Sequence, residues 1–189
     1  MFRIDFADRS SAPWEAEVGS GLEYRQTTVT RCVDSSPPVA TVPATEKMTY
    51  ETILPDEDRR RLDDETGWVY VDVRSVEEFA AGHPRGAYNI PIASRDPAMG
   101  SLVFNPEFLE VLQRTFDTSD NLILDCASGG RSAKACELLA EVGYTVLANM
   151  HCGFSGFSHP GGFEPGWQAL GFESGEGNPE GKGYDALRC

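Results

Sequence analysis

The stretch NLILDCASGGRSAKACELL, residues 121–139, places a cysteine and two glycines between a predicted strand and a predicted helix. The run 121–126 is short and apolar enough for a strand, and the helix is expected to begin near Ser132 and to end at Gly143. Ligand sites in parallel sheets lie outside the carboxyl ends of the strands, which is where Cys126 stands. The stretch therefore predicts a fold class and a functional loop together.

The chain from residue 45 onwards continues this alternation of strands and helices. The run WVYVDVR, residues 68–74, is rich in β-branched and aromatic residues and is typical of a strand buried on both faces. Further strands are predicted over 86–92 and 145–150, and helices over 56–64, over 75–82 and from Asn105. The alternation predicts an α/β fold with a mainly parallel sheet that helices cover on both faces.

Two of these helices carry capping signals at their starts. Ser75 is predicted as an N-cap, with Glu78 completing a capping box. Asn105 is predicted as the other N-cap, with Pro106 at the first helical position.

Composition and charge limit the classes of protein and partner. With 189 residues, 40% of them hydrophobic and 24% charged, the chain has the size and composition of one soluble domain with an appendage. No apolar run approaches the roughly 18 residues that cross a bilayer, so no membrane partner is expected. The net charge of -14 leaves no basic footprint for nucleic acid. An anionic substrate must therefore be attracted by a local positive field.

Composition also divides the chain into three segments. Residues 1–44 are predicted as a partly flexible N-terminal extension, 45–173 as the domain, and the glycine-rich 174–189 as a flexible C-terminal tail. The N-terminal residues resemble neither a secretory signal nor a transit peptide. The five cysteines form no CxxC pair, which favours free thiols in a reducing compartment, and we expect a cytoplasmic location.

The loop around Cys126 has the composition of an anion-binding nest. Gly129 and Gly130 allow backbone conformations in which successive amides converge. A helix N-terminus and the charge of Arg131 follow the thiol, and such neighbours lower a cysteine pKa from about 8.5 to about 3.5–7.5. The residues therefore predict a nucleophilic thiolate that needs no histidine base. The alternatives are a plain turn with a buried cysteine and a phosphate-binding loop, although the glycine patterns of nucleotide-binding loops are absent.

Two motifs together resemble the rhodanese family of sulfurtransferases. They are DVRSVEEFAAGHPRGAYNIP, residues 72–91, and LDCASGGRSAKACELLAEVGY, residues 124–144, within a resemblance that covers about residues 45–172. The family implies a five-stranded α/β fold and a persulfide on the loop cysteine, with no cofactor. It also implies transfer of sulfane sulfur from a small anionic donor such as thiosulfate to cyanide or a thiol, including a thiol of a partner protein.

The resemblance assigns roles by position. Cys126 would accept the sulfur, and Asp72 and Arg74 would brace the site, either as a structural ion pair or in direct contact with the substrate. The amides of residues 127–131 would cradle the sulfur, while Arg131 and the Ser128 hydroxyl would help to hold an anionic donor. The predicted substrate-binding residues are Ala127, Ser128, Gly129, Gly130, Arg131 and Ser132.

Two other functions remain open at this point. The first is a sulfur-carrier or interaction module that delivers sulfur only to a protein docking on the N-terminal extension. The second is a cysteine-dependent phosphatase or arsenate reductase. The loop from Cys126 through Arg131 has six residues, as in the sulfurtransferases. The related phosphatases and arsenate reductases need one residue more to surround a tetrahedral oxyanion, which disfavours this second function.

The chain departs from the family pattern after the last predicted strand. The segment NMHCGFSGFSHPGGFEPGWQALGF, residues 149–172, is longer and richer in glycine and aromatic residues than the family's usual loop. Cys152 in this segment is predicted either as a second thiol that relays sulfur or as a small buried residue. The histidines at 83, 151 and 159 are too scattered in sequence for a ligand pattern, so no metal is predicted.

Overall fold

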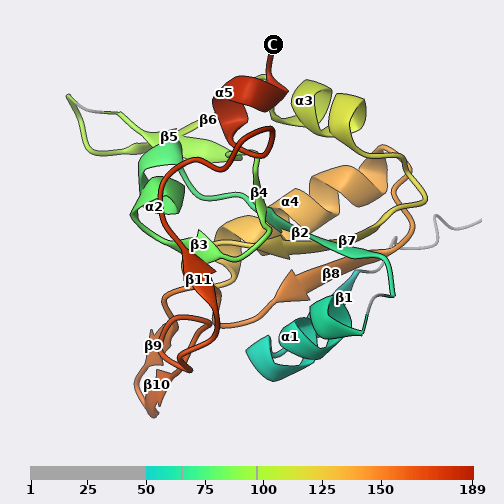
Figure 1. The fold of residues 1–189 in the computed structure, drawn as a ribbon. Coiled ribbons are helices and arrows are strands. Elements are labelled where there is room, and N and C mark those ends of the chain that lie inside the picture. The colour runs from blue at the N-terminus through green and yellow to red at the C-terminus, as the bar shows by residue number, and fades with distance from the viewer. Residues whose placement is uncertain (1–49, 65, 97) are drawn as a thin grey trace, which may run out of the picture. The chain divides into compact units, whose positions relative to one another are not determined.

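The computed structural model describes residues 50–189, with the exception of residues 65 and 97. Its centre is a parallel sheet of five strands in the order β1-β8-β7-β2-β4 (Figure 1). The strands are β1 (Glu51–Ile53), β2 (Trp68–Asp72), β4 (Tyr88–Asn89), β7 (Asn121–Asp125) and β8 (Leu147–Met150). The α/β class with a parallel five-stranded sheet is thereby confirmed. The edge strand β1 had no signal of its own in the sequence.

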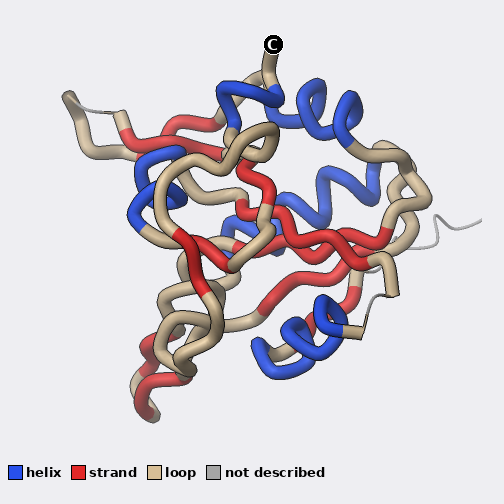
Figure 2. Tube along the Cα trace, in the orientation of Figure 1, coloured by secondary structure: helices blue, strands red, loops and turns tan. Residues whose placement is uncertain are grey.

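Helices cover both faces of this sheet, because alternate residues of the central strands face opposite ways. Leu122 and Leu124 of β7 belong to one core cluster and Ile123 to the other. The first cluster packs against α3 (Phe108–Thr115) and α4 (Gly130–Glu141), and the second against α1 (Pro55–Asp63) and α2 (Val76–Ala81). Figure 2 shows the helices on the two sides of the strands.

The structure confirms one predicted helix start and corrects two. Ser75 caps α2, and its side chain forms the predicted capping box with Glu78. The third helix, α3, begins at Phe108 and not just after Asn105. The Asn105 Oδ1 accepts from the Glu107 amide at 3.1 Å, while its Nδ2 donates to the Pro91 carbonyl and the Tyr184 hydroxyl. Helix α4 begins at Gly130, two residues before the prediction.

The C-terminal segment differs from the flexible tail that its glycine content predicts. The short strand β11 (Ser174–Gly175) pairs with β3 (His83–Pro84), and α5 (Tyr184–Leu187) lies against the domain. Tyr184 is 8% exposed and belongs to the first core cluster, and its hydroxyl donates to Glu107 at 3.0 Å. Strand pairing and the buried Tyr184 side chain thus anchor a segment whose composition alone suggests mobility.

Two antiparallel hairpins complete the domain. They are β5 (Ala93–Arg95) with β6 (Leu102–Phe104), and β9 (Phe157–His159) with β10 (Gly162–Glu164). The second hairpin arises from the long segment after β8. In the part of the chain that the structure describes, no helix combines the length and apolarity needed to cross a bilayer. The predicted N-terminal extension, residues 1–44, lies outside the described residues.

Candidate active site

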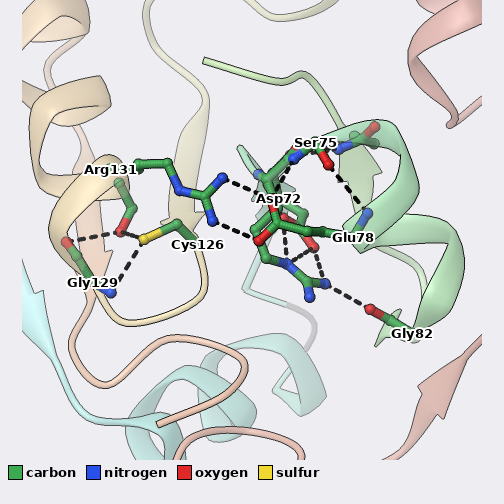
Figure 3. A network of polar contacts seen from close by, with 10 residues as sticks. Asp72, Ser75, Glu78, Gly82, Cys126, Gly129 and Arg131 are labelled. Atoms are coloured by element: carbon green, nitrogen blue, oxygen red, sulfur yellow. Dashed lines mark hydrogen bonds and ion pairs between the residues drawn. The ribbon is translucent and has the colours of Figure 1, made fainter. Parts of the chain in front are cut away.

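Cys126 lies at the carboxyl end of the central strand β7, as the sequence predicts. It is 1% exposed, and its Sγ accepts hydrogen bonds from the Gly129 amide at 3.2 Å and from the Ser132 hydroxyl at 3.5 Å (Figure 3). Gly129 has a φ of 93°, a left-handed conformation that glycine adopts without strain and that turns its amide towards the sulfur. The loop therefore supplies two hydrogen-bond donors to the Cys126 sulfur.

The side chain of Arg131 is committed to a partner from a distant part of the sequence. Its two terminal nitrogens donate to the two carboxylate oxygens of Glu78, each at 2.8 Å (Figure 3). Burial acts to raise the pKa of Glu78, but hydrogen bonds from Arg131 and from the Ser75 amide hold this pKa at about 2. The pair ties the start of α4 to the start of α2. Since Glu78 offsets the Arg131 charge, the predicted role of Arg131 in holding an anionic donor stays a prediction.

Asp72 and Arg74 form a buried ion pair at the end of β2, beside the cysteine strand. They are 0% and 3% exposed, and the Arg74 Nε donates to both Asp72 oxygens at 3.0 Å. Arg74 also donates to the Gly82 carbonyl at 2.6 Å, and its guanidinium lies 4.1 Å from the ring centroid of Phe154. These contacts are those of a structural ion pair, and direct contact of Asp72 or Arg74 with a substrate stays a prediction.

Asp125, directly before the cysteine, is a feature of the site that the sequence analysis missed. It is fully buried, and the buried Tyr70 hydroxyl is its polar neighbour, although no hydrogen bond of good geometry joins them. Burial, followed by the nearby charges of Asp72 and Cys126, raises the pKa of Asp125 well above its ordinary value. The raised pKa favours the protonated, uncharged form of the Asp125 carboxyl group beside the cysteine. The signal in the sequence was an acidic residue closing an apolar strand.

The divergent segment after β8 packs directly on the cysteine loop. The amides of Phe154 and Ser155 donate to the carbonyls of Cys126 and Ala127 at 2.8 and 2.9 Å. A methyl group on Gly153 would lie only 2.3 Å from the Cys126 carbonyl oxygen. The backbone of this segment therefore forms one wall of the site.

Cys152 is buried in the same segment, at 2% exposure, and its thiol donates to Glu164 at 3.3 Å. Burial and this hydrogen bond raise the pKa of Cys152 to about 11, so that it is a thiol at neutral pH. His151 and His159, from the same segment after β8, both contact the Glu164 carboxylate. The relay role of Cys152 stays a prediction.

The central parallel strand β7 ends at the buried Cys126, and the glycine turn and helix start that follow donate hydrogen bonds to its sulfur. The protein is therefore an α/β domain with a cysteine-loop site. The sequence profile of the rhodanese-like domain matches residues 55–160, more than half of the chain. The chain belongs to the rhodanese-like domain family.

Individual relatives agree with this assignment. The chain is 41% identical over 95 residues to thiosulfate sulfurtransferase 16, chloroplastic, of Arabidopsis thaliana, a match that covers 50% of this chain and 78% of that protein. It is 38% identical over 96 residues to protein HIGH ARSENIC CONTENT 1, mitochondrial, of the same species, covering 51% of this chain and 56% of that protein. The crystal structure of Rv0390 from M. tuberculosis has a TM-score of 0.57 at 30% identity, covering 68% of this chain and 100% of that chain.

Proposed function

We propose that this protein is a sulfurtransferase in which Cys126 carries sulfane sulfur as a persulfide. The observation that carries the proposal is the pair of hydrogen bonds from the Gly129 amide and the Ser132 hydroxyl to the Cys126 sulfur. Family membership and the similarity to a protein named as a thiosulfate sulfurtransferase support the same activity. The proposed substrates are a small anionic donor such as thiosulfate and a thiophilic acceptor such as cyanide or a thiol.

The reaction consists of two displacements at sulfur. The Cys126 thiolate attacks the sulfane sulfur of thiosulfate, the sulfur–sulfur bond of the donor breaks, and sulfite leaves with the electron pair. The acceptor then attacks the outer sulfur of the persulfide, and the electron pair returns to the Cys126 sulfur. No external oxidant or reductant is needed. The negative charge on Sγ falls in the first step and returns in the second. A loop of preorganised donors stabilises this charge.

The loop geometry also limits where the transferred sulfur is placed. A sulfur–sulfur bond is about 2.05 Å long, so the outer sulfur of the persulfide sits about one bond length beyond Sγ. The amides of residues 127–131 line that position in the proposed mechanism, and Ser128 and Gly130 belong to this cradle. The raised pKa of Asp125 favours its uncharged form, which would limit negative charge next to the Cys126 thiolate.

Mass spectrometry of the intact protein after exposure to thiosulfate tests the persulfide. We expect a gain of one sulfur that maps to Cys126 and that cyanide removes, with loss of both in Cys126→Ser. Cys189→Ser, which changes an exposed thiol, is the matched control and should load normally. Unmodified Cys126 after exposure to thiosulfate and to organic polysulfides would contradict the proposal.

Turnover separates the enzyme from the two alternative functions. The full chain and a chain starting at residue 45 should transfer sulfur from thiosulfate to cyanide at similar rates if the domain is a general enzyme. A stable persulfide with negligible turnover would favour a carrier that serves a protein partner. Hydrolysis of an aryl phosphate that depends on Cys126 would favour phosphatase chemistry over sulfur transfer.

A further inference from the structure

Three side chains of metal-binding type, His151, Cys152 and His159, converge on the Glu164 carboxylate in the β9–β10 hairpin. The Glu164 Oε2 lies 3.2 Å from the His151 Nε2 and 3.3 Å from the Cys152 Sγ. The other oxygen, Oε1, lies 3.1 Å from the His159 Nε2. The candidate ligand atoms of His151, Cys152 and Glu164 all lie within 4.8 Å of one another.

Two of these separations, both to the Glu164 Oε2, are close to the edges of a tetrahedral metal site. Bonds of about 2.0–2.1 Å to nitrogen or oxygen and about 2.3 Å to sulfur give tetrahedral edges of about 3.3 Å from nitrogen to oxygen and about 3.5 Å from sulfur to oxygen. The two distances to the Glu164 Oε2 are close to these values. Imidazole, thiolate and carboxylate together are a donor set that suits zinc and similar divalent ions.

Backbone structure helps to hold the four residues in this arrangement. His159 and Glu164 lie on the paired strands of the hairpin, where His159 is opposite Gly162 and Glu164 is opposite Phe157. Cys152 has a φ of 69°, the one positive φ of a non-glycine residue in the described part of the chain. Such a conformation costs about 1–2 kcal/mol, which the surrounding contacts must offset.

Exposure and charge also suit a bound divalent cation. The side chains of His151, His159 and Glu164 are 39%, 34% and 42% exposed, so an ion reaches them from solvent, while Cys152 is buried behind them. The Phe157 ring, 5.7 Å from that of His151 and 5.8 Å from that of His159, lies beside both imidazoles. A carboxylate and a thiolate supply two negative charges, which balance a divalent ion when both imidazoles are neutral.

We propose that His151, Cys152 and Glu164 bind a divalent ion of the zinc class, with His159 holding the second oxygen of the Glu164 carboxylate. The fourth position of the ion is open to water or to an exogenous ligand. On binding, the sulfur–metal bond forms and the Cys152 proton leaves to solvent. The ion fixes the hairpin to the segment 151–156, whose amides donate to the Cys126 loop. Cys152 in this state is a metal ligand and not a free relay thiol.

Cobalt is the probe for this site, because a thiolate bound to Co²⁺ gives a charge-transfer band and tetrahedral coordination gives intense visible bands. The metal-free full chain should bind one Co²⁺ with both features, and Zn²⁺ should displace it. Cys152→Ser should lose the charge-transfer band. Cys126→Ser and Cys189→Ser are the matched controls and should keep it, since their thiols lie outside the cluster.

Two further variants keep the test decisive where Cys152→Ser fails to fold. Glu164→Gln and His159→Asn change exposed hairpin residues, and circular dichroism of the metal-free proteins checks their folding. Glu164→Gln should abolish tight binding, and His159→Asn should weaken it by about 10–100-fold, as is usual for a residue that orients a metal ligand. Absence of a charge-transfer band in the unaltered chain, or its loss in Cys126→Ser with retention in Cys152→Ser, would overturn the proposal.

Discussion

Three glycines in the Cys126 loop or packed against it differ sharply in what a methyl group would meet. At Gly130 an added Cβ contacts nothing within 4 Å, and the residue lies in the first turn of α4. At Gly129, with a φ of 93°, the nearest atom is the Met150 carbonyl oxygen at 3.4 Å. At Gly153, with a φ of 61°, the Cβ would lie within 2.6 Å of three backbone atoms of the cysteine loop. Alanine substitutions should therefore form a graded series.

The expected changes in the free energy of unfolding follow from these contacts. Gly130→Ala should stabilise the protein by about 0.5–1 kcal/mol, because alanine restricts the unfolded chain and suits a helix. Gly129→Ala should cost about 1–2 kcal/mol for the left-handed conformation. Gly153→Ala combines that cost with forced displacement of backbone, typically about 1–3 kcal/mol, for a total of about 2–5 kcal/mol. This is a large share of the about 5–15 kcal/mol that stabilises a domain.

Urea unfolding of the three variants, followed by persulfide loading with thiosulfate, measures both effects. Gly153→Ala should have the lowest midpoint and should load Cys126 least, because the wall of the site must move away from the cysteine loop. Gly130→Ala serves as the control for an added methyl group in the unfolding measurement. Equal midpoints for Gly153→Ala and Gly130→Ala would refute the packing of the segment 151–156 on the cysteine loop.

Three further predictions concern charge and the C-terminal segment. Glu78→Gln should cost about 1 kcal/mol at pH 7 after allowance for solvent screening. The folded pKa of Glu78, about 2, lies below the unfolded value, so the stability difference between the variant and the unaltered protein should disappear as the pH falls from about 4.5 to about 2. A difference in urea midpoints that does not change with pH would contradict the Arg131 pairing. Asp58 is buried without hydrogen-bond partners, and burial raises its pKa. Its ionisation therefore lowers the free energy of unfolding more and more as the pH rises above the unfolded pKa of about 3.9. Asp58→Asn should then melt higher than the unaltered protein at pH 7 but not at pH 3, and an equal gain at both pH values would exclude this cause. Tyr184→Ala should cost about 3–5 kcal/mol in urea unfolding, and an unchanged midpoint would show that the C-terminal segment does not support the core.

The local signals of the sequence were sufficient for the framework of the site. The apolar run before Cys126 predicts β7, and the Ser75–Glu78 capping box predicts the start of α2, because both depend on residues that are neighbours in the chain. The two motifs also place the chain in its family, and the family carries the five-stranded sheet. The prediction for α3 was right about the local contact, since the Asn105 Oδ1 accepts from the Glu107 amide at 3.1 Å, but a turn precedes the helix, which begins at Phe108. The bonds of the Asn105 Nδ2 to Pro91 and Tyr184 join distant segments, which no local rule includes.

The sequence by itself determined which cysteine stands at the end of the central strand and what kind of loop follows it. Only the tertiary structure decided that Arg131 pairs with Glu78, 53 residues away, and that the C-terminal segment is anchored by Tyr184. It likewise brought His151, Cys152 and Glu164 together, although their spacing follows no ligand pattern. The physical reason is the range of the interactions. Caps, turns and strand patterns act between neighbours, whereas the partner of a charge or a thiol depends on how distant segments pack.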